Sequence, residues 1–189
     1  SYFYSLAALS TSAEIELSTY HKSSLQGDSL LVSIYKQLGV STTFKENSIL
    51  LSKEKITTLN ELRLDLNSSP DLAQTIVVTC FGLGIACHIT GLHTLKIKET
   101  DRLLALENEL TKLGATISVT SDSLSLAPSS QIHKNIAIKT YEDHRMAMAF
   151  APLALKVPMV IENAEVVSKS FPDFWKNLED FKIYHKILP

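Results

Sequence analysis

The sequence predicts an α/β (α+β) fold built from repeated units, each with a strand, a helix, a second strand, a second helix and a strand pair. Apolar residues alternate at period two in some segments and recur at helical spacing in others. The pattern also repeats along the chain, because Leu38 matches Leu113 and Ile49 matches Leu124, each 75 positions later. The 189 residues, 45% of them hydrophobic, are enough for one domain with a real core.

The first unit opens with residues 2–9, which have the composition of an apolar helix. Residues 13–18 (AEIELS) alternate apolar and polar, which predicts a half-buried strand. Apolar residues at helical spacing predict a helix over residues 29–38, and Gly39 is suited to end it. Two short runs within residues 40–52 then predict a hairpin.

The second unit repeats this order in full. Residues 61–66 predict a strand, residues 70–83 an apolar helix and residues 86–90 a second strand. Leucines on one side of residues 100–113 predict an amphipathic helix. Residues 115–127 (ATISVTSDSLSLA) predict a second hairpin, which closes the unit.

A third unit is predicted to follow, with strands at residues 135–140 and 158–163 and helices at residues 144–155 and 171–181. The first unit lacks an opening strand, and the third lacks its closing pair. The chain also opens in mid-helix without an initiator Met. We therefore expect residues 1–189 to form a single domain whose missing strands come from elsewhere in a longer chain.

Charge and hydropathy argue against several classes of protein. The formal net charge of -2 gives no reason to expect nucleic acid or an acidic membrane surface as a partner. No apolar run approaches the roughly 20 residues of a membrane span. The apolar N-terminus lacks the basic region and cleavage site of a signal peptide. We therefore expect a cytoplasmic protein with no membrane and no nucleic-acid partner.

Neither the cysteines nor the histidines predict a metal site. Cys80 and Cys87 lie in apolar stretches without the CxxC spacing of a zinc site or the density of a disulfide scaffold. His88 and His93 flank a predicted strand end without metal-ligand spacing. We expect buried free thiols, structural histidines and no metal.

Polar or charged clusters stand at the start of the predicted helices. A helix N-terminus exposes unpaired N–H groups and partial positive charge, so it binds anions readily. Capping alone is the commoner reason for Ser, Asp or Pro at such places. The clusters are residues 68–75 (SSPDLAQT), 96–103 (KIKETDRL), 141–148 (YEDHRMAM) and 168–175 (SKSFPDFW), with a weaker one at 23–30 (SSLQGDSL).

The cluster at residues 96–103 carries cations where a helix begins. Lys98 and Arg102 are unfavourable there unless a negative group lies nearby. Glu99 and Asp101 supply that charge in a purely structural arrangement. In a functional arrangement a bound carboxylate or phosphate supplies it, and Arg102 offers a bidentate fork. Glu99 and Arg102 are three residues apart and can share a helix face.

The other clusters pose the same choice. Asp143 is suited to capping, and Arg145 follows it at the tip of a helix that is apolar nearly all round. Asp71 either complements the helix dipole or acts as an acid or base that faces the same anion. Lys169 taken alone is an ordinary solvated lysine, and Ser170 after it is a predicted cap of the last helix.

Three segments in register resemble the enolpyruvylshikimate-phosphate synthase family. Residues 98–102 (KETDR) resemble its KETDR or KESDR signature, residues 143–148 its DHRMAM signature, and residues 169–174 (KSFPDF) its K-[TS]-F-P-x-F segment. Three shorter matches fit the opening of the same domain: residues 1–3 (SYF), 26–28 (QGD) and 70–71 (PD). The resemblance covers essentially the whole chain.

The resemblance implies the C-terminal domain of a two-domain enzyme with its active site between the domains. The implied enolpyruvyl transferase fold consists of βαβαββ units, with helices buried and sheets outside. The implied reaction moves the enolpyruvyl group of phosphoenolpyruvate to the 5-hydroxyl of shikimate 3-phosphate and releases phosphate, without a metal or an organic cofactor. The implied partners are these two substrates and the missing N-terminal domain.

The resemblance also implies residue roles. Asp71 would act as base on the attacking hydroxyl, and Glu99 would donate a proton to the methylene carbon. Lys98 would contact the substrate hydroxyl and the phosphoenolpyruvate region. Arg102 and Arg145 would clamp the phosphoenolpyruvate carboxylate. Such positioned charge stabilises the oxocarbenium-like centre that protonation at carbon creates.

Two further residues extend this comparison. Lys169 would help to bind the phosphate of phosphoenolpyruvate. Thr94 stands where the family often carries Asn, which departs from the pattern. The family's remaining substrate ligands lie in its other domain, so we expect this chain alone to be inactive or nearly so.

Three alternatives stay open. A UDP-N-acetylglucosamine enolpyruvyl transferase shares the architecture but lacks this trio of signatures. An RNA 3'-phosphate cyclase of this fold is expected to be more basic overall. A non-catalytic anion-binding module would keep the fold without the chemistry, although the intact set of charged residues argues against this decay.

Overall fold

The computed structural model describes residues 1–18, 28–55, 59–181 and 183–184. Most of the weaker polar cluster predicted at residues 23–30 lies outside these described residues. The helices and strands within them follow the predicted order.

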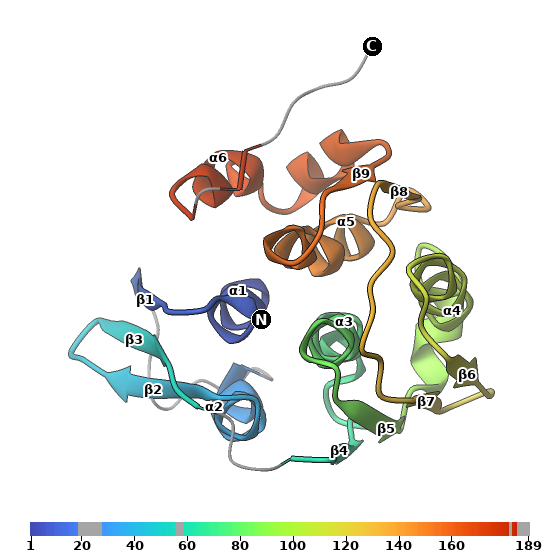
Figure 1. Cartoon of the computed structure of the whole chain (residues 1–189), viewed down its shortest axis with the longest axis horizontal. Helices are drawn as coiled ribbons and strands as arrows, with labels where there is room; N and C mark the ends of the chain where they lie inside the picture. The colour runs from blue at the N-terminus through green and yellow to red at the C-terminus, as the bar shows by residue number, and fades with distance from the viewer. Residues whose placement is uncertain (19–27, 56–58, 182, 185–189) are drawn as a thin grey trace.

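Three apolar helices form the centre of the molecule (Figure 1). They are α1 (Tyr2–Leu9), α3 (Ala73–Leu83) and α5 (His144–Phe150). The three sheets lie around them, on the outside. This arrangement confirms the predicted α/β architecture, in which apolar helices are buried and sheets cover them.

The first two sheets share a three-stranded antiparallel core. The first has the order β1-β3-β2, and the second has the order β4-β5-β7-β6, in which β4 is parallel to β5. Their strands are β1 (Glu14–Ser18), β2 (Val40–Phe44), β3 (Ser48–Lys53), β4 (Glu61–Asp65), β5 (Ala86–Thr90), β6 (Ile117–Val119) and β7 (Leu124–Leu126). The hairpin registers agree at the predicted offset, because Phe44 pairs with Ile49 and Val119 pairs with Leu124.

The third sheet is the smallest within the described residues. It pairs β8 (Ile136–Ile138) in parallel with β9 (Met159–Ile161). The remaining helices are α2 (Asp28–Gln37), α4 (Arg102–Lys112) and α6 (Phe174–Glu179), with 3-10 helices η1 (Pro70–Leu72), η2 (His93–Ile97), η3 (Ala151–Leu155) and η4 (Ala164–Lys169). The sequence did not predict η2 or η4 as separate elements.

Proline accounts for two differences from the prediction. The helix predicted over residues 144–155 is α-helical only to Phe150, since Pro152 has no N–H to continue the hydrogen bonding. The last helix begins at Phe174, after Pro172, because the residue before a proline is disfavoured in the helical conformation. Ser170 therefore ends η4, and the prediction that it caps the last helix was wrong.

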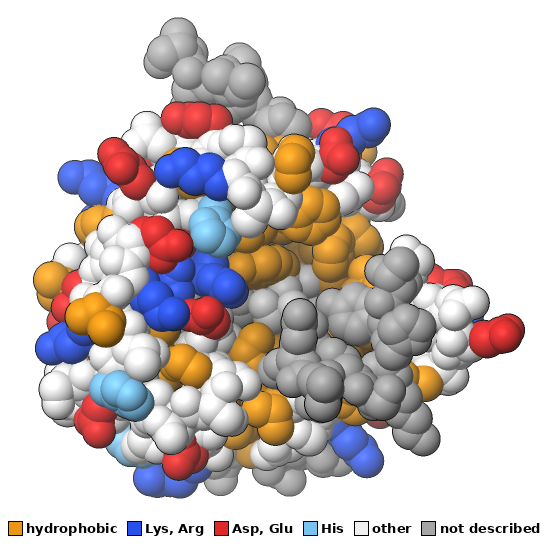
Figure 2. Space-filling model, turned by 180° about the vertical axis from the view of Figure 1, so that it is seen from behind, with side chains coloured by type: hydrophobic (Ala, Val, Ile, Leu, Met, Phe, Trp, Pro, Cys, Tyr) orange, Lys and Arg blue, Asp and Glu red, His pale blue; other side chains and the backbone are white. Residues whose placement is uncertain are grey.

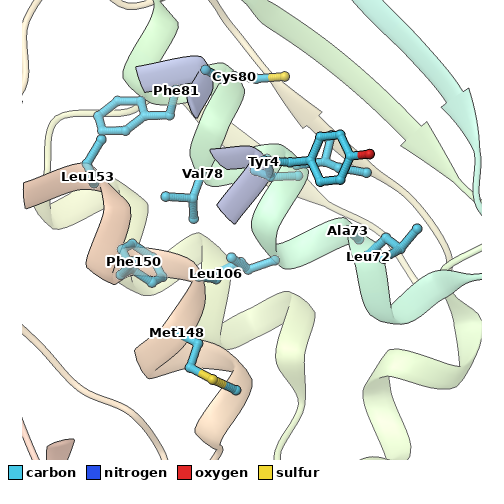
Figure 3. Close-up of a cluster of buried hydrophobic side chains, with 14 of the residues drawn as sticks. Tyr4, Leu72, Ala73, Val78, Cys80, Phe81, Leu106, Met148, Phe150 and Leu153 are labelled. Carbon is cyan, nitrogen blue, oxygen red and sulfur yellow. The ribbon is translucent and has the colours of Figure 1, made fainter. Parts of the chain in front are cut away.

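The core lies where the central helices meet (Figure 3). The close-up includes Tyr4, Val78 and Phe150, which come from α1, α3 and α5. Helix α3 passes so close to its neighbours that a Cβ at Gly82 would lie 2.6 Å from a Leu9 methyl and 2.8 Å from a Leu153 methyl, so a larger residue there would have to displace these side chains.

The two cysteines and one of the two histidines match their predicted structural roles. Cys80 and Cys87 are buried free thiols, as predicted. His88 pairs with the Ser125 hydroxyl at 2.8 Å, which supports its structural reading. Within the described ranges, none of the helices has the length and apolarity needed to cross a membrane.

Candidate functional site

Charged side chains from three helix starts meet at one place. Asp71 lies in η1, Arg102 is the first residue of α4, and Asp143 immediately precedes α5. These elements are brought together because α3, which follows η1, packs against both α4 and α5. One face of the molecule shows Lys and Arg side chains gathered with acidic and histidine side chains beside a broad apolar area (Figure 2).

Arg102 is the centre of this site. Its side chain is only 2% exposed. Its guanidinium donates from Nε to Asp143 Oδ2 at 2.6 Å, from Nη1 to Asp71 Oδ1 at 2.7 Å, and from Nη2 to Glu99 Oε2 at 2.7 Å. Each guanidinium nitrogen thus contacts a carboxylate. The fixed, planar arrangement of the arginine donors suits this pattern, whereas lysine has only a single nitrogen.

Asp143 serves two elements at once. One carboxylate oxygen accepts the Arg145 backbone N–H at 2.8 Å, which caps α5 as predicted. The other accepts Arg102 Nε. The side chain is 0% exposed, so its negative charge depends on this guanidinium for compensation.

Two cations that are more exposed than Arg102 lie next to Asp71. Lys98 Nζ is 3.6 Å from Asp71 Oδ1, and Arg145 Nη2 is 3.4 Å from Asp71 Oδ2. Both side chains are about one-third exposed, so they are accessible to a ligand. Asp71 therefore faces three cations, two of which are open to solvent.

The structure thus brings together five of the six predicted site residues: Asp71, Lys98, Glu99, Arg102 and Arg145. Lys169 is exposed at the end of η4, which packs against α5, and it makes no salt bridge within the described part of the chain. The prediction had assigned Asp143 only to capping, and it missed the pairing with Arg102. No local pattern could reveal a contact between residues 41 positions apart.

The sequence also allowed a purely structural arrangement, in which Glu99 and Asp101 compensate the cations at residues 96–103. The structure confirms this arrangement in part. Glu99 pairs with Arg102, as that alternative proposed, whereas Asp101 instead caps α4 by accepting the Leu104 N–H at 3.1 Å. Arg102 is therefore already satisfied by protein carboxylates. Lys98 and Arg145 have the longer contacts and the greater exposure.

Two groups of the site have shifted pKa values. A backbone hydrogen bond and the nearby cations, chiefly Arg102, hold the pKa of Glu99 below its ordinary value of 4.5, although burial acts in the opposite direction. Burial lowers the pKa of His144 below its ordinary 6.5, despite the opposing effect of Asp143. At neutral pH the site thus has an ionised Glu99 and a neutral His144, and its three paired carboxylates balance its three cations.

Such a site can bind an anion and exchange protons with it. Exposed Lys and Arg groups attract carboxylate or phosphate, while neighbouring carboxylates can accept or donate protons. Among the residues that the structure describes, no group of three or more His, Cys, Asp or Glu side chains is placed to hold a metal ion.

Replacement of Arg102 by lysine is expected to destabilise the protein strongly. Arg102→Lys removes the fork that binds three carboxylates and leaves Asp143 buried with poor compensation. The expected loss is about 3 kcal/mol in the free energy of unfolding, measured by urea denaturation. Arg63→Lys, which alters an exposed pair with Glu61, is the matched control and should change stability by less than about 0.5 kcal/mol. Equal effects of both substitutions would contradict the central role of Arg102.

The stabilising effect of Glu99 is expected to depend on pH. Since its pKa is lowered on folding, its contribution is complete above its ordinary pKa of 4.5 and is lost as pH falls through the lower folded value. Near neutral pH, Glu99→Gln should cost at most about 1 kcal/mol, because the side chain is half exposed. The stability difference between the two proteins should disappear in acid. A difference that stays constant down to about pH 3 would refute this assignment.

Comparisons with known proteins identify related sequences and folds. Residues 1–178 match the profile of the family described as EPSP synthase (3-phosphoshikimate 1-carboxyvinyltransferase). The chain is 46% identical over 181 residues to the 3-phosphoshikimate 1-carboxyvinyltransferase of Bacteroides fragilis, covering 94% of this chain and 44% of that protein. It is 36% identical over 186 residues to that of Syntrophobacter fumaroxidans, covering 96% and 43%.

Solved structures with similar folds give the same picture at lower identity. An EPSP synthase from Acinetobacter baumannii superposes with a TM-score of 0.79 at 21% identity, over 95% of this chain and 44% of that one. The enolpyruvyl transferase NikO from Streptomyces tendae superposes with a TM-score of 0.65 at 13% identity, over 96% and 41%. These likenesses show the fold, and the chain spans less than half the length of the relatives that it matches. By its match over residues 1–178, the chain belongs to the EPSP synthase family.

Proposed function

We propose that this chain is one domain of an enzyme that transfers the enolpyruvyl group of phosphoenolpyruvate to the 5-hydroxyl of shikimate 3-phosphate and releases phosphate. The observation that carries the proposal is the convergence of Asp71, Lys98, Glu99, Arg102 and Arg145 in one site. These residues combine exposed cations for anionic substrates with carboxylates for proton transfer. No cofactor takes part in the proposed reaction.

The single domain of residues 1–189 is proposed to be the C-terminal half of the active protein. The chain covers 44% of the relative from Bacteroides fragilis, which leaves room for a second domain. Within the described residues the middle sheet has four strands and the others three and two, so strands from the rest of the protein would complete them. The broad apolar area in Figure 2 supports a partner surface. The free thiols suit the cytoplasm, where we place the protein.

Lys98 and Arg145 are proposed to make the first contact with the substrates. Both are partly exposed, and both flank Asp71 within 3.6 Å. Arg145 would bind the carboxylate of phosphoenolpyruvate, and Lys98 would lie between that substrate and the attacking hydroxyl. Asp71 would take the hydroxyl proton, because its carboxylate contacts three cations and is partly open to solvent.

Glu99 is proposed as the proton donor to the methylene carbon. Its lowered pKa leaves it ionised in the free protein, whereas a donor must carry a proton. An anionic substrate would offset the charge of Arg102 and Arg145 and so raise the pKa of Glu99. Under this proposal, substrate binding and protonation of Glu99 are coupled.

Arg102 and Lys169 complete the proposed set. Arg102 would contribute positive charge to the binding of the phosphoenolpyruvate carboxylate from its buried position, since its nitrogens already hold Asp71 and Glu99. Lys169 would approach the phosphate of phosphoenolpyruvate from η4, next to α5. Its exposure and its lack of an ion pair among the described contacts leave it available for this contact.

Phosphate release from shikimate 3-phosphate and phosphoenolpyruvate tests the reaction. We expect none from this chain alone and turnover once the remaining domain is added, because the site has only one wall here. Normal turnover by the chain alone would overturn the two-domain proposal. Silence in an associated mixture that binds UDP-N-acetylglucosamine would favour the sister transferase. Silence with no binding of either substrate would favour a non-catalytic domain.

Asp71→Asn in the complete protein is expected to lower kcat by about a hundredfold or more, since the amide cannot accept the hydroxyl proton. The change should leave the KM of phosphoenolpyruvate within about threefold, because Lys98 and Arg145 remain. The steady-state rate of phosphate release measures both constants. Asp180→Asn, at an exposed aspartate after α6, is the matched control and should have no effect. An unaltered kcat in Asp71→Asn would remove Asp71 from the proposed chemistry.

A further inference from the structure

Glu109 is a buried carboxylate to which the proposed chemistry gives no role. It lies on α4, two turns after Arg102, and its side chain is 0% exposed. A buried carboxylate is unfavourable unless opposite charge and hydrogen bonds compensate it. Lys112 supplies the charge, with Nζ at 2.8 Å and 2.6 Å from the two carboxylate oxygens.

Two further contacts connect Glu109 to the segment that leads into α5. The Lys139 backbone N–H donates to Oε2 at 3.1 Å, and the Tyr141 hydroxyl donates to Oε1 at 2.7 Å. Burial and the bond to Glu109 raise the pKa of Tyr141, so the phenol keeps the proton that it donates. Glu109 therefore holds this segment through both a backbone group and a side chain.

The segment then makes a turn that its own residues do not favour. Tyr141 and Glu142 have φ values of 55° and 56°, and the Asp143 N–H donates to the Thr140 carbonyl at 2.9 Å. A turn with two positive φ angles at its centre favours Asn and Gly. Tyr and Glu keep such a conformation only where their surroundings impose it. The hydrogen bond to Tyr141 is a contact of this kind.

Helix α4 thus holds both ends of this turn. Glu109 accepts the Lys139 N–H just before the turn and the Tyr141 hydroxyl within it, and Arg102 binds Asp143, the last residue of the turn. Both residues lie on one helix, seven positions apart and therefore on the same face, so the two holding points are fixed relative to each other.

We infer that Glu109 is a positioning residue, whose carboxylate holds the turn at residues 140–143 so that Asp143 meets Arg102 and the site carboxylates are oriented. Glu109 acts through Tyr141 and Asp143 and touches no substrate. The effect on turnover rests on the proposed function, whereas the effect on Arg102 does not.

Glu109→Gln in the complete protein tests this inference. Glutamine keeps the shape of the side chain but loses its negative charge. It also replaces one of the two acceptor oxygens with an N–H donor. We expect hydrogen exchange of the Arg102 Nε–H, followed by NMR with isotope-labelled arginine, to become about tenfold faster. We expect kcat to fall about tenfold with KM values within about threefold, because the catalytic groups are displaced while the exposed cations remain.

A second variant and a rescue separate positioning from a loss of folding. Tyr141→Phe removes only the hydroxyl. The Arg102 Nε–H should then exchange about threefold faster, and kcat should fall about threefold. Glu142→Gly relieves the turn, since glycine adopts positive φ freely. When Glu142→Gly is added to Glu109→Gln, the exchange rate of the Arg102 Nε–H and kcat should both return to within about twofold of the parent protein.

Glu107→Gln is the matched control, because Glu107 lies on the same helix and has no salt bridge among the described residues. This control substitution should change neither the exchange rate of the Arg102 Nε–H nor kcat. Unchanged exchange at Arg102 in folded Glu109→Gln would overturn the inference, as would failure of Glu142→Gly to restore it. If exchange responds as expected but even the parent protein turns over no substrate, the positioning role stands and the proposed function fails.

Discussion

The pairing of one buried guanidinium with three carboxylates determines how the site is assembled. Arg102 contacts Asp71, Glu99 and Asp143, which come from η1, the loop before α4 and the start of α5. A buried ion pair adds little net stability compared with apolar packing, but loss of one partner is costly. The guanidinium is therefore better understood as a constraint on geometry than as a source of stability, since the three segments can approach only in the arrangement that matches its fork.

The apolar helices explain why these charges meet at all. Helix α3 is buried over its first nine residues, and α5 is buried beyond Arg145. Charged groups on such helices are tolerated only at their ends, where capping and solvent satisfy them. Packing α3 against α4 and α5 brings those ends together, so the hydrophobic core and the charged site result from the same arrangement. The sheets lie around the helices, and none of the three segments that contact Arg102 is a strand.

Much of this could be predicted from sequence, because the signals are local. Periodicity predicted the strands and helices, and the repeat predicted matching hairpins such as Phe44–Ile49. Capping by Asp143 and the i,i+3 pair of Glu99 and Arg102 also follow from spacing. Two features do not. The contact between Arg102 and Asp143 depends on tertiary packing. The left-handed turn at Tyr141 runs against the preference of its residues, so only the surrounding contacts, Glu109 among them, account for it.

The division of the cations suggests how a ligand would change the site. Arg102 is enclosed and fully engaged, whereas Arg145 and Lys98 are open and more loosely paired. A ligand carboxylate that seeks the guanidinium of Arg102 must displace one of its partners. Glu99 is the most exposed of the three and is held by one nitrogen, while Asp143 is buried and bound from two sides. Displacement of Glu99 would remove the cation that helps to keep it ionised, so the arrival of an anion and the uptake of a proton by Glu99 would occur together.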